Sequence, residues 1–262
     1  MTGDAAGCLG VPGGALMHPR DASVHRKEIS EMTIKPTVIL VHGFWGGAAH
    51  WGKVIARLDK RGYTSIFAVE NPLTSLADDA ERTRKMIAQQ KGPVLLVGHS
   101  YGGAVITQAG NQPNVIGLVY IAAFAPDDGE SPGGITASNP PAAASNLAPD
   151  SDGYLWIKQD KFHESFCQDL TAEEGLVMAV TQKAPLASTF GDKITAPAWK
   201  NKPSWYQISS NDRMIAPENE TMMSKRLGAK KIITLEASHA SLASRPDEVT
   251  ALIDEAATTL QS

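Results

Sequence analysis

Cysteine is nearly missing from this chain of 262 residues, which holds only Cys8 and Cys167. Two thiols so far apart provide neither a disulfide framework nor the close ligand spacing of a thiolate metal site. We therefore expect free thiols, no bound metal and a reducing compartment, the cytoplasm.

Long apolar runs and an excess of positive charge are also lacking. No stretch of the sequence approaches the roughly 20 apolar residues that a membrane-spanning helix needs. The formal net charge is -4, with 20% charged residues, which leaves no basic stripe for nucleic acid or an anionic membrane. We expect neither as a partner, whereas a homodimer stays open. The motifs of nucleotide-binding loops and zinc hydrolases are missing as well, so neither a nucleotide-dependent enzyme nor a zinc enzyme is expected.

The composition divides the chain into three parts. Residues 1–31 are rich in glycine and proline, show little periodicity and are predicted to be a flexible N-terminal extension. Residues 32–125 and 203–262 alternate apolar runs with amphipathic segments of helix length, as expected for one catalytic domain. Residues 126–202 lose this rhythm and are predicted to be a cap inserted over the active site.

Six short apolar runs predict the strands of the core. Segments of helix length separate them, which favours right-handed crossovers and a parallel sheet with helices on both faces. The predicted fold class is therefore α/β, with a mostly parallel sheet of about six strands. The predicted strands are residues 37–42, 63–69, 93–97, 115–122, 204–209 and 231–235.

The motif Gly98-His99-Ser100-Tyr101-Gly102 follows the third of these strands and precedes an apolar segment of helix length. A strand, a sharp turn and a helix in this order are typical of a nucleophile elbow, which exposes the central serine. A side chain at position 98 or 102 would collide with the facing backbone where the chain reverses so tightly, and glycine avoids the collision. Ser100 is therefore the predicted nucleophile.

A serine hydroxyl needs a base that takes its proton and a carboxylate that orients this base. In an open parallel sheet such groups gather beyond the carboxyl ends of the strands. His239 alone among the histidines lies on the loop after the last predicted strand and is the predicted base. Asp212, after the second-last strand, is the predicted acid, and Asp127, Asp128 and Glu236 are the alternatives.

Two backbone amides are predicted to form an oxyanion hole. The tetrahedral intermediate of acyl transfer carries negative charge on oxygen, and amides aimed at this oxygen contribute a few kcal/mol each. Tyr101 starts the elbow helix and Phe44 follows the first strand, so these two residues are the predicted donors. Gly43 and Trp45 of the same loop are predicted to contact the substrate.

Two histidines beside these motifs are predicted to have structural roles. His42 stands at the mouth of the first loop, where its ring would brace the loop rather than abstract a proton. His99 directly precedes the nucleophile and should point away from it, because neighbouring strand residues face opposite sides.

Four motifs together resemble the α/β-hydrolase fold, in the compact branch of plant methylesterases and hydroxynitrile lyases. They are His42-Gly43-Phe44-Trp45-Gly46-Gly47, Gly98-His99-Ser100-Tyr101-Gly102-Gly103, Asp212-Arg213 with Pro217, and Ser238-His239, and the similarity covers about Thr33 to Leu260. The resemblance implies hydrolysis of carboxylic esters without a cofactor. Hydroxynitrile lyases of this branch carry a lysine shortly after the histidine. This chain has Ala240-Ser241-Leu242 there, which favours an esterase over a lyase.

The sequence thus predicts a serine hydrolase that cleaves a small, largely apolar carboxylic ester through an acyl-enzyme. Two alternatives stay open: the same triad acting on a lactone, an amide or a carbon–carbon bond, and a ligand receptor with negligible turnover. Apolar residues of the cap are candidates for lining an acyl or alcohol pocket, while packing within the cap is expected for most of them. They are Trp156, Phe162, Phe166, Leu176, Met178 and Trp199.

Overall fold

The computed structural model describes Gly3 and residues 35–261, so the predicted extension, residues 1–31, lies outside the described residues apart from Gly3. Within residues 35–261, six parallel strands form the main sheet in the order β2-β1-β3-β4-β7-β8. The strands are β1 (Thr37–Val41), β2 (Ile66–Val69), β3 (Val94–Ser100), β4 (Val115–Ala123), β7 (Ser204–Ser209) and β8 (Lys231–Leu235). The predicted parallel sheet is confirmed.

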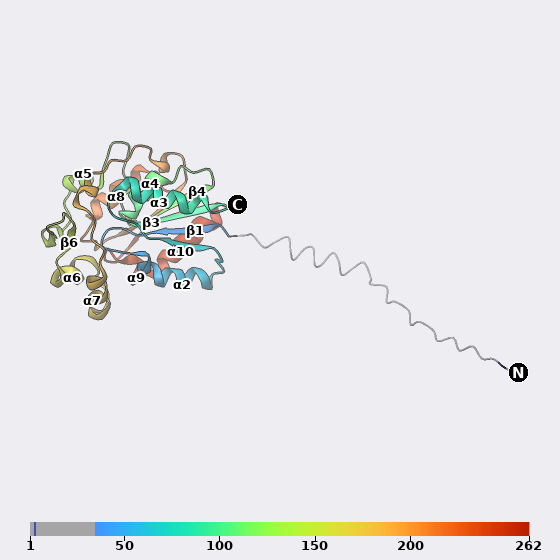
Figure 1. Cartoon of the computed structure of the whole chain (residues 1–262), viewed down its shortest axis with the longest axis horizontal. Helices are drawn as coiled ribbons and strands as arrows, with labels where there is room; N and C mark the ends of the chain where they lie inside the picture. The colour runs from blue at the N-terminus through green and yellow to red at the C-terminus, as the bar shows by residue number, and fades with distance from the viewer. Residues whose placement is uncertain (1–2, 4–34, 262) are drawn as a thin grey trace. The chain divides into compact units, whose positions relative to one another are not determined.

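Helices cover both faces of the sheet (Figure 1). One face carries α2 (Gly52–Lys60), the short α9 (Ser241–Ser244) and α10 (Pro246–Thr259), and the other carries α3 (Leu76–Ala88), α4 (Gly102–Ala109) and α8 (Pro217–Arg226). Alternate residues of β1 therefore enter different cores: Val38 and Leu40 pack on the first side, Ile39 and Val41 on the second. Burial on both faces explains why central strands such as β1 and β4 read as continuous apolar runs. Every helix in the described part of the chain is too short or too polar to span a bilayer.

Three helices begin at local sequence signals. Ser75 precedes α3, and its Oγ accepts a hydrogen bond from the amide of Asp78 at 3.1 Å. Thr171 and Glu174 form a reciprocal capping box at the start of α7 (Ala172–Thr181). Pro217 is the first residue of α8. These signals depend only on residues within one turn of each other, so they can be recognised without the rest of the fold.

The second strand is shorter than the sequence predicts, because β2 begins at Ile66 and not at Tyr63. The amide of Tyr63 donates to the carbonyl oxygen of Leu58 at 3.1 Å, and its hydroxyl donates to Oδ1 of Asp254 at 2.8 Å. Tyr63 therefore completes the end of α2 and joins it to α10, although its aromatic ring is typical of a strand residue.

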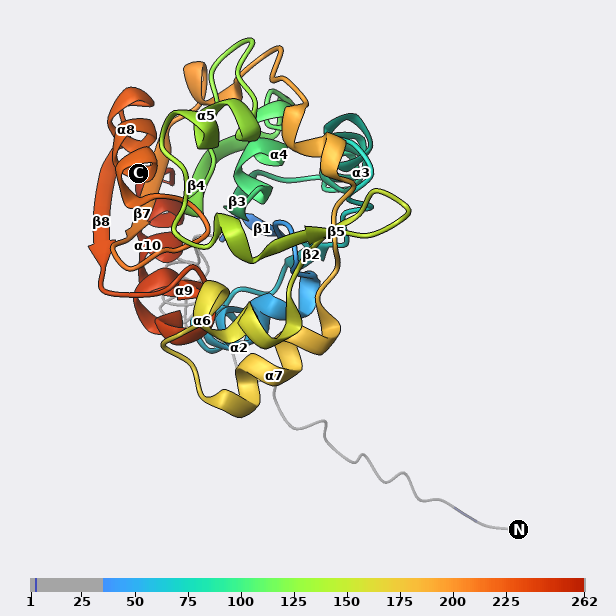
Figure 2. The ribbon, with the colours of Figure 1, turned by 90° about the vertical axis from the view of Figure 1, so that its left-hand side faces the viewer.

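Residues 126–202 connect β4 to β7 and fold into short elements. These are α5 (Pro132–Ser138), the antiparallel pair β5 (Leu147–Pro149) and β6 (Leu155–Ile157), α6 (Phe162–Phe166) and α7. Figure 1 shows them gathered at one end of the sheet, and Figure 2 looks onto that end.

Hydrogen bonds tie residues 126–202 to loops that follow strands of the main sheet. The amide of Leu186 donates to the carbonyl oxygen of Leu73, after β2, at 2.9 Å. The amide of Ala240, after β8, donates to the carbonyl oxygen of Phe166 at 3.1 Å. This segment therefore lies at the carboxyl ends of the strands, where parallel sheets place their functional loops.

Candidate active site

Ser100 lies at a strained reversal between β3 and α4. It is the last residue of β3 and has a φ of +56°, a left-handed conformation that costs a residue with a side chain on the order of 1 kcal/mol or more. A Cβ atom on Gly98 would lie 2.6 Å from the carbonyl oxygen of Gly102, and one on Gly102 would collide with the carbonyl oxygen of Val41. The close approach predicted for both glycines is observed, and it presents the serine at the apex of the turn.

Gly102→Ala is expected to destabilise the protein by roughly 3 kcal/mol, because the new methyl group meets a backbone oxygen of β1 that cannot move aside. Urea unfolding measures this change. Gly52→Ala is the matched control: a Cβ atom there, in α2, meets nothing within 4 Å, and alanine at that helical position is expected to stabilise by up to about 1 kcal/mol. Equal losses in both variants would show that steric crowding at the elbow is not the cause.

The loop after β1 lies directly against the nucleophile. A Cβ atom on Gly43 would lie 2.9 Å from Oγ of Ser100, so a larger residue would displace the hydroxyl. The rings of Phe44 and Tyr101 stack with their centroids 3.9 Å apart. Within the described residues neither the Phe44 amide nor the Tyr101 amide donates a hydrogen bond. The two predicted oxyanion donors thus stand on adjacent segments with their N–H groups unused.

His42 braces this loop through both nitrogens of its ring. Nδ1 donates to the carbonyl oxygen of Gly43 at 2.8 Å, and Nε2 accepts the amide of Asn71 at 3.0 Å. Both bonds form together only when the ring carries its proton on Nδ1. The structural role predicted for His42 agrees with this geometry.

Trp45 links the same loop to residues 126–202. Its amide donates to the carbonyl oxygen of Lys183 at 3.0 Å, and its indole Nε1 donates to that of Leu155 at 2.7 Å. The side chain is buried, with 3% of its surface exposed. This burial assigns Trp45 a part in holding the loop, and the predicted contact with substrate stays a prediction.

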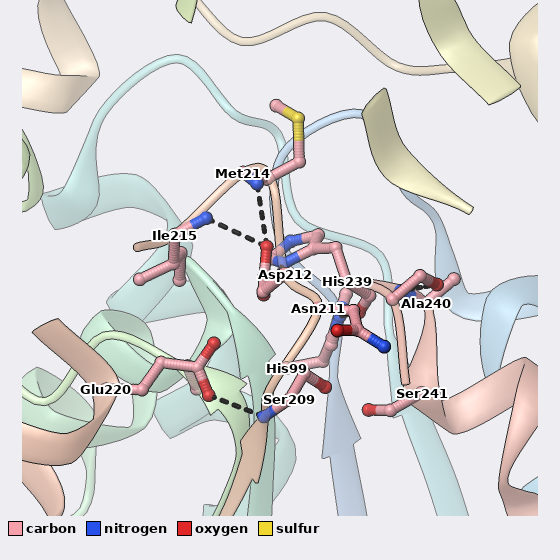
Figure 3. Close-up of polar contacts among 12 residues, drawn as sticks. His99, Ser209, Asn211, Asp212, Met214, Ile215, Glu220, His239, Ala240 and Ser241 are labelled. Carbon is pink, nitrogen blue, oxygen red and sulfur yellow. Dashed lines mark hydrogen bonds and ion pairs between the residues drawn. The ribbon is translucent and has the colours of Figure 1, made fainter. Parts of the chain in front are cut away.

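The structure brings together Asp212 and His239, which follow the neighbouring strands β7 and β8. Nδ1 of His239 donates to Oδ2 of Asp212 at 2.5 Å. The other oxygen, Oδ1, accepts the amides of Met214 at 2.7 Å and Ile215 at 2.9 Å (Figure 3). The carboxylate therefore holds the imidazole proton on Nδ1, which leaves the lone pair of Nε2 to act as a base.

His99 joins the end of β3 to the loop that carries His239. Its Nε2 donates to the carbonyl oxygen of His239 at 2.8 Å, and the centroids of the two rings lie 4.8 Å apart. Burial holds the pKa of His99 well below its ordinary value, so this ring is neutral. This bond holds His99, which directly precedes Ser100, in contact with His239, the predicted base.

Nε2 of His239 is a buried nitrogen that has no hydrogen-bond partner among the described residues. Phe166, from residues 126–202, packs edge-on against the same ring with centroids 4.9 Å apart. The imidazole is thus held by Asp212 on one nitrogen and shielded by an aromatic ring, while the other nitrogen is unoccupied. This is the arrangement that a general base requires.

The alternative acids lie in other environments. Asp127 pairs with Nζ of Lys200 at 2.5 Å, and this hydrogen bond lowers the pKa of Asp127. Asp128 and Glu236 are exposed. Within the described residues the carboxylate bonded to His239 is that of Asp212.

Two buried carboxyl groups beside the site were not predicted. Asp79, in α3, accepts the hydroxyl of Tyr101 at 2.7 Å and the amide of Leu73 at 2.8 Å, and burial raises its pKa. Glu220, in α8, accepts the amide of Ser209 at 3.0 Å. Both acids stand in the first turn of a helix, where the helix dipole alone favours acidic residues. The sequence therefore provides no signal that they are buried.

His50 lies beside the site, in the 3-10 turn Ala48–Trp51. Its ring is 6.1 Å from that of Phe166 between centroids. Burial lowers the pKa of His50 to about 4. A partly buried imidazole that resists protonation makes the fold sensitive to acid.

The pKa of His50 predicts a loss of stability on acidification. Between about pH 6.5 and pH 4 the unfolded chain binds a proton at this imidazole that the folded chain excludes. The free energy of unfolding therefore falls with falling pH, by up to roughly 3 kcal/mol over this window. The melting temperature is expected to fall less steeply with falling pH across this window for His50→Gln than for the wild type. Equal slopes in the two proteins would contradict this assignment.

Comparison with known proteins gives consistent matches. A model of the alpha/beta hydrolase family matches residues 38–252. The alpha/beta hydrolase nvfD of Aspergillus novofumigatus is 28% identical over 248 residues, which cover 86% of this chain and 97% of the relative. A pyrethroid hydrolase from Sphingobium faniae JZ-2 has a TM-score of 0.72 at 21% identity, covering 85% of this chain and 97% of its own. Polyneuridine aldehyde esterase has a TM-score of 0.73 at 19% identity, covering 85% of this chain and 99% of its own. At these identities the two solved structures show a common fold alone.

Proposed function

Because the chain belongs to the alpha/beta hydrolase family and is a hydrolase, we propose that it cleaves a small carboxylic ester through an acyl-enzyme on Ser100. The observation that carries the proposal is the hydrogen bond of 2.5 Å between Nδ1 of His239 and Oδ2 of Asp212. The loop of His239 is in turn bonded to His99, the residue before Ser100. An esterase among the proteins that share the fold supports the same reaction class.

In the proposed reaction Oγ of Ser100 attacks the ester carbonyl carbon while Nε2 of His239 takes the hydroxyl proton. Asp212 stabilises the imidazolium that forms. The former carbonyl oxygen becomes negative and accepts hydrogen bonds from the backbone amides of Phe44 and Tyr101. The imidazolium then gives its proton to the departing alkoxide, which leaves as the alcohol. Water, deprotonated by the same imidazole, releases the acid and restores the serine.

Aromatic side chains near these groups support an apolar substrate. Phe166 packs on His239, and Phe190 packs on Phe44 with ring centroids 4.5 Å apart. Both belong to residues 126–202, which we propose to be the cap of the active site. Two other residues considered for a pocket lining lie at the surface, since Trp156 is 39% exposed and Leu176 is 59% exposed.

A covalent probe and an ester panel test this function. Purified protein is treated with a fluorophosphonate and examined by intact mass and peptide mapping, and p-nitrophenyl esters of increasing acyl length are assayed in parallel. We expect one adduct, on Ser100, and turnover that is fastest for short acyl groups. An adduct on another residue, or labelling of Ser100 without turnover of any ester, would contradict the proposed esterase. In the second case product analysis with lactones, amides and β-diketones would identify the bond that is cleaved.

A further inference from the structure

Glu220 is a buried carboxyl group that the proposed mechanism does not use. It lies in the first turn of α8, and none of its surface is exposed. Oε2 accepts the amide of Ser209, at the end of β7, at 3.0 Å (Figure 3). Oε1 is buried and has no hydrogen-bond partner among the described residues. A negative charge with one unpaired oxygen would be costly in such a place.

Two ionisable groups lie near enough to this carboxyl to interact with it electrostatically. Asp212 lies in the loop after β7, and Tyr206 lies on β7 itself, where its hydroxyl donates to the carbonyl oxygen of Ala123. In the described part of the chain no basic side chain pairs with Glu220. Burial first, and the charge of Asp212 second, raise the pKa of Glu220 well above its ordinary value.

The hydrogen bonds decide which of the two acids keeps the proton. Neighbouring buried carboxyl groups do not both ionise, because the two charges repel each other at low dielectric. Asp212 accepts the imidazole of His239 and two backbone amides, and each of these bonds favours its ionised form. Glu220 accepts one backbone amide. The negative charge therefore belongs to Asp212 and the proton to Glu220.

We propose that Glu220 is a positioning residue for the hydrolytic site: a neutral acid that adds no second negative charge near Asp212 and whose carbonyl oxygen holds the amide of Ser209. Ser209 in turn accepts the amide of Asp212 through its own carbonyl oxygen at 3.2 Å. Glu220 thus holds Asp212 through the backbone at the end of β7. It contacts neither substrate nor reacting atoms. This inference rests on the proposed function and extends it to a residue outside the triad.

Glu220→Gln and Glu220→Leu separate this role from simple packing. A glutamine keeps one donor and one acceptor, so we expect kcat/KM for a p-nitrophenyl ester to stay within about threefold of the wild type. The acid limb of the pH profile should move by less than about 0.3 pH unit, because no charge is lost. Leucine leaves the amide of Ser209 unpaired, and we expect kcat to fall about tenfold or more with little change in KM.

A large shift of the acid limb in Glu220→Gln would overturn the proposal. If Glu220 were ionised in the wild type, glutamine would remove a negative charge beside the pair of Asp212 and His239. The limb would then move to lower pH by about one unit. If Glu220→Leu does not fold, the glutamine variant decides the question alone.

A second measurement does not depend on turnover. A glutamate that is neutral in the fold keeps a proton that the unfolded chain releases above about pH 4.3, so the wild type loses stability relative to Glu220→Gln as the pH rises. Urea midpoints between about pH 5 and pH 8 are expected to show this decline, with Glu218→Gln, an exposed residue of the same turn, as the control for net charge. A constant difference between wild type and Glu220→Gln would overturn the proposal. If the protein had no esterase activity at all, the proposed function would be wrong. The pH dependence of the urea midpoints would still decide whether Glu220 is neutral in the fold.

Discussion

Ser100→Ala is expected to lower kcat/KM for hydrolysis of p-nitrophenyl butyrate by about 10⁴-fold, because the variant lacks the oxygen that attacks the ester. The small activity that is left would come from the oxyanion amides and from substrate binding. The fold should be retained, since alanine is smaller than serine and meets the same strain at a φ of +56°. A variant that keeps more than about a tenth of the wild-type rate would rule out Ser100 as the nucleophile.

Two controls accompany this measurement. Ser210→Ala changes an exposed serine in the loop after β7, and its kcat/KM is expected to stay within about twofold of the wild type. The melting temperature of Ser100→Ala should match that of the wild type within a few degrees. The fluorophosphonate adduct should vanish in Ser100→Ala and persist in Ser210→Ala, which ties the loss of turnover to one hydroxyl.

Asp212→Asn is expected to lower kcat by about 10³ to 10⁴-fold with a much smaller effect on KM. The carboxylate accepts the proton on Nδ1 of His239, whereas an amide NH2 in its place would donate to Nδ1. The imidazole proton would then move to Nε2, the nitrogen that must receive the proton of Ser100. Steady-state kinetics with the same ester measure this effect, and the asparagine has almost the size of the aspartate.

Asp127→Asn is the matched control, because Asp127 was an alternative for the acid from the sequence. It pairs with Lys200, away from His239, so its replacement is expected to change kcat by less than about twofold. Equal losses in Asp127→Asn and Asp212→Asn would show that neither carboxylate orients the base specifically.

The core strands were predictable because their burial leaves a direct mark on the sequence. A strand covered on both faces is apolar throughout, as β1 and β4 are. The strands β7 and β8 were also predicted with their observed bounds. The elbow was recognisable for a related reason. Gly98 and Gly102 are required by backbone collisions, and a requirement for glycine is visible in the sequence itself.

The position of the polar groups followed from topology more than from local pattern. Asp212 and His239 follow adjacent parallel strands, so their loops had to meet at one edge of the sheet. Glu220 and Asp79 could not be found in this way, because an acid in a first helical turn looks the same whether it faces water or a core. Most of the short elements of residues 126–202 lack periodicity, so apart from the start of α7 neither their bounds nor their contacts with the site could be predicted.

The two hydrogen bonds of Trp45 have a consequence for engineering. Their acceptors, the carbonyl oxygens of Lys183 and Leu155, belong to the inserted segment, while Trp45 directly follows Phe44. A chimera that receives this segment from another member of the family would need backbone acceptors at the same two places. Without them the graft would alter the rate of the chemical step together with the choice of substrate, so the segment and the loop are expected to be exchangeable only as a pair.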